Sequence, residues 1–169
     1  WKAAAELYGP PYFMNQDEEY MTGLNERFWA GILREQHLLL HEPHENYFYH
    51  YDETSGLWRP ESKPRLEQLV CDTVHAESKG DPEYLKHAQL SFASAVVGHL
   101  KGMNERRNAF SADPVGIHVA NGYLVIGPDS VELHDFSPHY YSRNRSPIAF
   151  DPKARCPMFM EQVLKPALD

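Results

Sequence analysis

Apolar residues recur at helical spacing early in the chain. In LNERFWAGILREQ, Phe28, Trp29, Ile32 and Leu33 fall on one face of a helix. Asn25 precedes them and has the side chain of a good N-cap, because its oxygen can accept a bond from a free backbone N–H. The pattern predicts an amphipathic helix that packs on a core.

Two further helices are predicted between residues 62 and 104. The first, in KPRLEQLVCDTVHAES, begins near Pro64, and Gly80-Asp81-Pro82 ends it. The second is expected to run as one long helix through PEYLKHAQLSFASAVVGHLKGMNE. Together they are expected to form a helical hairpin. The apolar positions expected on their inner faces are Leu66, Leu69, Val70, Val74, Leu85, Leu90, Phe92, Ala93, Val96, Val97 and Leu100.

Strand-like alternation marks the stretch between these helical segments. In NYFYHYDETSGLWRPE, Tyr47, Tyr49 and Tyr51 alternate with Phe48 and His50, and DETSG supplies the residues of a turn before LWR returns. The preceding HLLLHEP is expected to be a short strand. Later, HVANGYLVIGPDSVELHDF is expected to form two short strands, with turn residues at NG and GP. The segment AFDPKARCPMFMEQVL then predicts a loop and a helix that starts near residue 158.

This order of elements predicts an α+β fold, in which short antiparallel β-hairpins pack with a helical hairpin and flanking helices. Residues 1–21 are expected to be an N-terminal arm or linker, in which QDEE turns a small hairpin after YFMN. Residues 22–169 are expected to form one domain. Its expected parts are a helix with the aromatic hairpin (24–60), the helical pair (62–104), and a β segment with a C-terminal helix (113–169).

Composition supports a folded chain. The 169 residues are 42% hydrophobic and 12% aromatic, which suits a packed domain rather than a disordered tail. No apolar run approaches the roughly 20 residues of a membrane-spanning helix, and no signal peptide opens the chain, so we expect a cytoplasmic protein without a membrane partner. The opening WKAAAELYG lacks Met and suggests a fragment. Cys71 and Cys156 do not make a disulfide framework and are expected to be reduced, although a single bridge stays open.

The net charge of −8 disfavours non-specific nucleic-acid binding over the whole surface, because phosphate binding depends on Lys and Arg. Two local basic clusters, KGMNERR and SRNRS, remain. Tyr140 and Tyr141 precede the second cluster, so arginines and aromatics interleave there as they do on single-strand binding surfaces. The alternative is that they are solvated loops or pair with the acidic excess. The candidate nucleic-acid-binding residues are Arg106, Arg107, Tyr140, Tyr141, Arg143 and Arg145.

Catalytic motifs are absent from the sequence. It contains no P-loop, no GxGxxG after a strand, no CxxC pair and no GxSxG elbow. The grouped side chains His37, His41, His44, Glu42 and Glu45 could bind a metal or could form a polar strand edge and turn. The segment HDFSPH could likewise hold ligands or an acid–base pair, or end a strand. We prefer the structural interpretation for both and predict no catalytic residue and no metal ligand.

The sequence resembles a known family in two places. FYHYDETSGLWRP resembles the fYxYdxxtGxW hairpin of the D5 N-terminal-like domain of phage and plasmid DNA primase–helicases, and DPVGIHVANGYLVI with VELHDFSPHYYSRNRSPIAFDPKARCPMF resembles its second signature. The resemblance covers roughly residues 24–164, with PDS in place of the usual dlrTGel turn. The residues expected to have structural signature roles are Trp58, Asn121, Gly122, His134, Asp151, Pro152, Cys156 and Pro157.

This resemblance implies that the domain lies next to a helicase motor in its parent protein. In such proteins the domain precedes a superfamily-3 AAA+ helicase, often with a primase domain upstream. It implies a non-catalytic accessory or connector domain that supports helicase assembly and DNA engagement. Its expected partners are the downstream helicase domain of the same polypeptide and single-stranded DNA, in a homo-hexameric parent. No cofactor is expected in this fragment, whereas the helicase would use ATP and Mg²⁺. The alternatives are a stand-alone single-stranded nucleic-acid-binding or regulatory module, and a small metal-dependent hydrolase.

Overall fold

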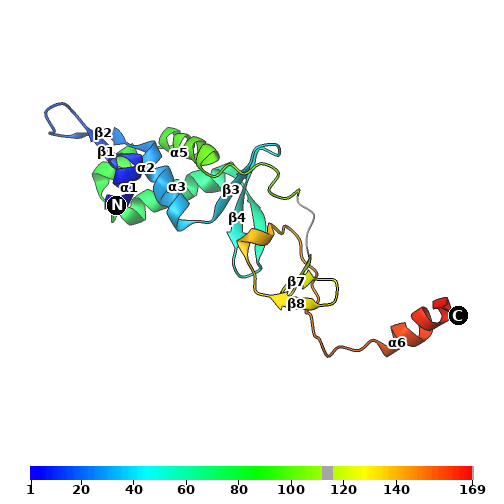
Figure 1. Ribbon diagram of the computed structural model, residues 1–169. Coiled ribbons are helices and arrows are strands. Elements are labelled where there is room, and N and C mark those ends of the chain that lie inside the picture. Colours follow the sequence, from blue (N-terminus) through cyan, green and yellow to red (C-terminus); the bar gives the residue numbers. More distant parts are fainter. Residues whose placement is uncertain (112–115, 169) are drawn as a thin grey trace. The chain divides into compact units, whose positions relative to one another are not determined.

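The computed structural model describes residues 1–111 and 116–168 and divides into two compact units. Unit 1 comprises Trp1–Asp113 and Ser137–Arg143, and unit 2 comprises Pro114–Phe136 and Asn144–Asp169. The range 22–169, expected to be one domain, therefore contributes to both units. The α+β class is confirmed, because the described residues form helices and three small antiparallel sheets (Figure 1). None of the helices in these residues is both long enough and apolar enough to cross a membrane.

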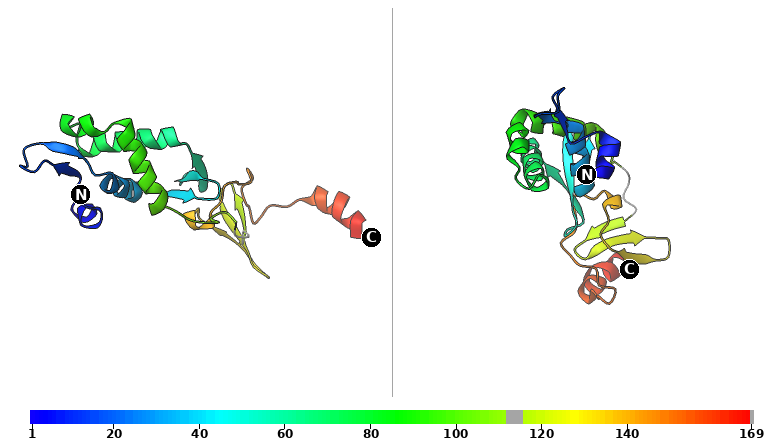
Figure 2. Two further views of the ribbon diagram at one scale, coloured as in Figure 1. Left: turned by 90° about the horizontal axis from the view of Figure 1, so that it is seen from above. Right: turned by 90° about the vertical axis from the view of Figure 1, so that its left-hand side faces the viewer.

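Unit 1 holds most of the regular structure. Helices α2, α3 and α5 lie side by side around its main core (Figures 1 and 2). Its elements are α1 (Lys2–Tyr8), β1 (Tyr12–Met14), β2 (Met21–Leu24), α2 (Glu26–Gln36), β3 (Leu39–Glu42), β4 (Tyr47–Asp52), β5 (Leu57–Glu61), α3 (Lys63–Glu77), α4 (Pro82–His87), α5 (Leu90–Met103) and the short 3-10 helix η1 (Pro138–Tyr140).

Helix α2 is the central helix, and its prediction is confirmed. The side-chain oxygen of Asn25 accepts hydrogen bonds from the backbone N–H groups of Arg27 and Phe28, at 3.1 and 3.4 Å. Phe28 and Trp29 are fully buried, and Ile32 and Leu33 are also in the core. An N-cap and one apolar stripe are therefore enough to place this helix.

The first 21 residues pack on the same core. Helix α1 contacts α2, and β1 pairs with β2 in a hairpin whose turn contains QDEE. The Trp1 ring lies edge-on to Phe28 and Trp29, with centroids 5.7 and 5.6 Å away. The indole N–H of Trp29 donates to the Pro11 carbonyl at 3.0 Å. The segment expected to be an arm is thus part of unit 1.

The predicted second long helix is interrupted, and the prediction of one continuous helix is wrong. Ala88, with φ −80° and ψ 52°, and the extended Gln89 separate α4 from α5. Leu85 and Leu90 flank this break and are 37% and 68% exposed, so they do not reach the core. The buried stripe on α5 from Phe92 onward agrees with the prediction.

The aromatic hairpin is confirmed, and β3 joins it to form an antiparallel three-stranded sheet in the order β3-β4-β5. Alternate residues of β4 point to opposite faces. Phe48 belongs to the main core beside the helices, whereas Tyr49 and Tyr51 belong to a second cluster with Leu40 and Trp58. Both faces of this sheet are therefore packed.

Unit 2 contains a second three-stranded sheet, where two strands were predicted, because the residues after the GP turn also pair. Its strands are β6 (Gly116–Val119), β7 (Gly122–Ile126) and β8 (Val131–His134). A helical segment follows as α6 (Pro157–Phe159), the π-helical turn η2 (Met160–Leu164) and α7 (Lys165–Leu168). Pro166 has no backbone N–H to donate to the preceding turn, and the residues before it adopt the wider π-helical form.

Candidate functional site

One segment returns to unit 1 although the residues on both sides of it belong to unit 2. This segment, Ser137–Arg143, is called the strap. It carries Tyr140, Tyr141 and Arg143, three of the six residues predicted to contact nucleic acid. Its contacts therefore decide whether those side chains are available to a ligand.

Trp58 of β5 holds the strap in three ways. Its backbone N–H donates to the Ser142 carbonyl at 2.8 Å, and its indole N–H donates to the Pro138 carbonyl at 3.0 Å. The Tyr141 ring stacks on the indole, with an interplanar angle of 7° and a centroid distance of 6.2 Å. Trp58 is only 5% exposed. The signature tryptophan thus has a structural role that joins two parts of the chain 80 residues apart.

Tyr141 contacts Arg106 as well as Trp58. The guanidinium of Arg106 lies 4.7 Å from the centroid of the Tyr141 ring, a cation–π distance. The Arg106 backbone N–H donates to the His41 carbonyl at 2.9 Å, which fixes this residue beside β3. Tyr141 adopts the left-handed conformation, with φ 46° and ψ 37°, which is strained for a bulky residue. The contacts with Trp58 and Arg106 hold the residue in this conformation.

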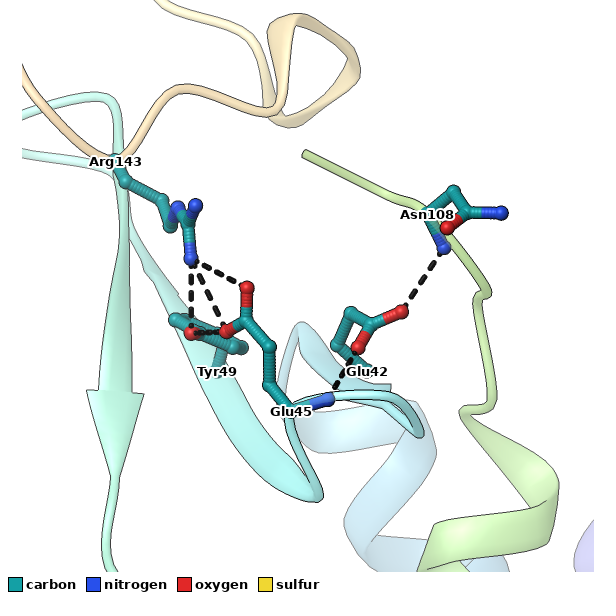
Figure 3. Close-up of polar contacts among 5 residues, drawn as sticks. All are labelled: Glu42, Glu45, Tyr49, Asn108 and Arg143. Atoms are coloured by element: carbon teal, nitrogen blue, oxygen red, sulfur yellow. Dashed lines mark hydrogen bonds and ion pairs between the residues drawn. The ribbon is translucent and has the colours of Figure 1, made fainter. Parts of the chain in front are cut away.

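Arg143 ends the strap in a polar hub (Figure 3). Its guanidinium donates to the two carboxylate oxygens of Glu45 at 2.9 and 3.1 Å and to the Tyr49 hydroxyl at 3.2 Å. The Tyr49 hydroxyl in turn donates to Glu45. The guanidinium also lies 4.5 Å from the centroid of the Phe110 ring. Burial lowers the pKa of Arg143, but the bonds to Tyr49 and Glu45 outweigh it and raise the pKa, so the group stays charged.

Glu42 fixes the turn that presents Glu45 (Figure 3). One carboxylate oxygen of Glu42 accepts from the Glu45 backbone N–H at 2.8 Å, and the other accepts from the Asn108 backbone N–H at 2.9 Å. Glu42 is only 3% exposed. Burial acts to raise its pKa, but these N–H donors outweigh burial, so the pKa lies below its ordinary value.

A glutamine at position 42 is expected to change how stability depends on pH. Because the folded pKa of Glu42 is depressed, its stabilising effect is present above the unfolded pKa and is lost as pH falls through the folded pKa. Glu42→Gln should therefore be less stable than the natural protein at neutral pH, and should lose less stability between pH 7 and about pH 3. Urea unfolding at both pH values measures this, with the exposed Glu35→Gln as control. Equal pH slopes for Glu42→Gln and the natural protein would contradict it.

Removing Arg143 is expected to loosen the strap moderately. The Arg143–Glu45 pair is 40% and 39% exposed, so its coupling should be about 0.2–1 kcal/mol, and the contact with Phe110 adds about 0.5–1 kcal/mol. Arg143→Ala should thus lower the free energy of unfolding by about 1–2 kcal/mol. A double-mutant cycle with Glu45→Gln, followed by tryptophan fluorescence in urea, isolates the coupling. Arg34→Ala, at an exposed arginine of α2, is the control. A zero coupling energy would show that the pair contributes nothing.

The two other arginines of the predicted set are Arg107 and Arg145. The Arg107 side chain donates to Glu105 at 2.8 Å, and Arg145 is exposed in unit 2. The structure thus places Arg106 against Tyr141, and Arg143 against Glu45 and Tyr49, while both arginines remain exposed. Sequence reasoning missed Glu45 as a partner of Arg143, because 98 residues separate them and no local pattern joins them.

The second signature closes a loop in unit 2. The Asn121 amide both accepts from the Phe150 backbone N–H at 2.8 Å and donates to the Phe150 carbonyl at 3.0 Å. Gly122 is buried, and a Cβ there would lie 2.4 Å from the His134 carbonyl oxygen, so only glycine fits between β7 and β8. Asn121 therefore fixes the loop at Phe150, and Gly122 allows β7 and β8 to approach closely.

The other signature residues lie near the surface. The His134 side chain lies 3.4 Å from Glu132, and the Asp151 carboxylate accepts from the Lys153 backbone N–H at 2.8 Å. Pro152 is exposed in the turn that Asp151 begins, and Pro157 starts α6. Cys156 is an exposed free thiol, and Cys71 is a half-buried one, so the structure contains no bridge between them. Among the described residues, no group of three or more His, Cys, Asp and Glu side chains is arranged to hold a metal ion.

Comparison with known proteins gives one result. The family model described as D5 N terminal like matches residues 25–167. No curated protein matches the chain. The matched range includes the aromatic hairpin, the strap and the Asn121–Phe150 loop. The chain belongs to the D5 N terminal like family.

Proposed function

We propose that this chain is a non-catalytic accessory domain of a phage or plasmid DNA primase–helicase, and that it connects to the helicase and supports its assembly and DNA engagement. Family membership over residues 25–167 carries the proposal, because it covers nearly the whole chain. In the proposed parent, a cytoplasmic homo-hexamer, the downstream helicase domain would bind ATP and Mg²⁺ and perform the chemistry.

The contacts of three of the predicted arginines weigh against independent DNA binding. Arg143 pairs with Glu45, Arg107 pairs with Glu105, and Arg106 lies over Tyr141. A phosphate would have to compete with these partners, on a chain whose net charge is −8. A stand-alone single-strand-binding or regulatory module is therefore the second candidate.

The assembly role is tested on the full-length parent. Its oligomeric state and its DNA-stimulated ATPase activity are compared with and without residues 25–167, by sedimentation velocity and a turnover assay. The proposal predicts that deletion weakens assembly and lowers stimulated turnover, while ATP binding to the helicase persists. Unchanged assembly and unchanged stimulation would contradict it.

The second candidate is tested by fluorescence anisotropy with labelled single-stranded DNA at low and moderate salt. Non-specific binding of basic proteins has dissociation constants of about 10⁻⁴–10⁻⁶ M. We expect no saturable, salt-sensitive binding to this chain in that range. Binding that weakens with salt and in an Arg106→Ala/Arg107→Ala variant would instead favour the single-strand-binding module.

A further inference from the structure

A cleft in unit 1 combines aromatic and acidic side chains. It lies between the β1–β2 hairpin and the start of α4, which contacts β2, and it has a volume of about 490 Å³. Besides two methionines, it is lined by three tyrosines and three acidic residues, which are Tyr12, Tyr20, Tyr84, Glu19, Asp81 and Glu83. Among the described residues that line the cleft, none is a lysine, an arginine or a histidine. The lining is therefore rich in aromatic rings and negatively charged.

The turn of the β1–β2 hairpin fixes two of these residues. The side-chain oxygen of Asn15 accepts hydrogen bonds from the backbone N–H groups of Glu19 and Tyr20, at 2.7 and 3.1 Å. The Asn15 backbone N–H donates to the Tyr20 carbonyl at 3.0 Å. The Tyr20 side chain is nevertheless 60% exposed. The hairpin thus holds the backbone of Tyr20 in place while the aromatic ring stays open to a ligand.

Tyr84 lies on the facing element, α4, and its ring is anchored by other aromatic rings. Its centroid lies 5.6 Å from that of Tyr12 and 6.2 Å from that of Trp29, both in edge-on geometry. Asp81 caps the same helix, because its carboxylate accepts from the Glu83 backbone N–H at 3.0 Å. These contacts position the lining of α4 before any ligand binds, which lowers the entropy cost of binding.

Two carboxylates of the cleft are unpaired. Glu19 and Glu83 are both exposed, and neither carboxylate forms a hydrogen bond or an ion pair with a residue that the structure describes. A concave surface lined by charges of one sign concentrates their field and attracts ligands of the opposite sign. The cleft is therefore expected to bind a cation.

The same chain already binds an arginine with these residue types. Arg143 donates to the Glu45 carboxylate and to the Tyr49 hydroxyl, and its guanidinium lies 5.8 Å from the centroid of the Tyr49 ring. A guanidinium is planar, stacks on aromatic rings and can donate two parallel hydrogen bonds to one carboxylate. An acidic cleft with tyrosine rings thus complements an arginine side chain in both charge and shape.

We propose that this cleft binds an arginine side chain presented by a protein partner. The guanidinium lies against the tyrosine rings and donates to the carboxylates of Glu19 and Glu83. Lysine carries a compact, strongly hydrated charge without the planar fork, so it fits less well. Nucleic acid is disfavoured as the occupant, because the carboxylates repel its phosphates. Such binding does not require the proposed helicase role.

An NMR titration of the isotope-labelled chain tests the site with two peptides blocked at both ends, Gly-Arg-Gly-Arg-Gly and Gly-Lys-Gly-Lys-Gly. The arginine peptide should shift the backbone amide signals of Tyr20 and Glu83 in a saturable way, and the lysine peptide should bind about threefold more weakly or less. Free spermidine, at the concentration of the arginine peptide, should not displace it. A dissociation constant above about 1 mM for the arginine peptide would overturn the proposal. Equal binding of the two peptides, or displacement by spermidine, would also overturn it, because the cleft would then recognise positive charge alone.

Variants of exposed lining residues show whether the peptide occupies the cleft. Glu19→Gln/Glu83→Gln should raise the dissociation constant of the arginine peptide about tenfold, and Tyr20→Ala should raise it about threefold, with unchanged circular dichroism spectra. The matched control, Asp17→Asn/Glu18→Gln, removes the same charge from the same hairpin turn outside the lining and should leave the dissociation constant nearly unchanged. If the control weakens binding as much as Glu19→Gln/Glu83→Gln does, the attraction is general and the proposal fails.

Discussion

Replacing Trp58 with alanine is expected to lower the free energy of unfolding of unit 1 by about 3–5 kcal/mol, the usual loss for a buried tryptophan. Trp58 is 5% exposed, stacks with Tyr141 and donates to the strap through both its backbone and its indole N–H. The truncation leaves a cavity and leaves the Pro138 carbonyl without its donor. Urea unfolding followed by tryptophan fluorescence measures the loss, because Trp1 and Trp29 remain in unit 1 as probes.

Trp58→Phe is the matched control. It keeps an aromatic ring for Tyr141 but removes the indole N–H, so it should lower stability by about 1 kcal/mol for the lost hydrogen bond and somewhat more for the smaller ring. Limited proteolysis should cut the strap faster in Trp58→Ala than in Trp58→Phe. If Trp58→Ala lowers stability by less than about 1 kcal/mol, the stacking and hydrogen bonds described for Trp58 do not hold the strap.

Gly122→Ala is expected to disrupt the pairing of β7 with β8 in unit 2, with a loss of about 1–3 kcal/mol. An added Cβ would lie 2.4 Å from the His134 backbone oxygen and 2.7 Å from the Leu133 side chain, and the backbone oxygen cannot move without breaking the ladder. Hydrogen–deuterium exchange of the β7 and β8 amides measures the effect, because all three tryptophans of the chain lie in unit 1.

Gly98→Ala provides the contrast for that substitution. Gly98 lies inside α5 with no atom within 4 Å of an added Cβ, so alanine there should stabilise the helix by about 0.5–1 kcal/mol. If Gly122→Ala lowers stability while Gly98→Ala raises it, the loss at Gly122 comes from the close approach of the added Cβ to the His134 carbonyl oxygen. It does not come from the loss of glycine itself. Unchanged exchange in Gly122→Ala would show that the β7–β8 ladder accepts a side chain.

Local sequence patterns predicted the helices and strands whose formation depends on residues close together in the chain. Asn25 caps α2 because an N-cap bond spans only a few residues, and the alternating tyrosines of β4 form a strand because both sheet faces are packed. Leu90 was misjudged because helical spacing cannot show the break at Ala88. The break lies in the backbone conformation of Ala88 and Gln89, which the spacing of apolar residues does not specify.

The strap could not be predicted from the sequence. Its interactions join Trp58 to Pro138 and Glu45 to Arg143, pairs separated by 80 and 98 residues. The basic and aromatic residues YYSRNRS indicated a ligand surface, but in unit 1 Tyr141 and Arg143 are bound by other residues of the same chain. The sequence marks Trp58 and Asn121 as signature positions, and in the structure Trp58 binds the strap and Asn121 binds Phe150.

The proposed place of this chain beside a helicase motor is tested most directly by reading its gene downstream of codon 169. The proposal predicts that the same reading frame continues and encodes GxxxxGK followed by Ser or Thr, the P-loop of a superfamily-3 helicase, within roughly a hundred codons, the length of a small domain. A stop codon with no such motif would contradict the role as a helicase-connected domain and would make the DNA-binding assay the deciding experiment.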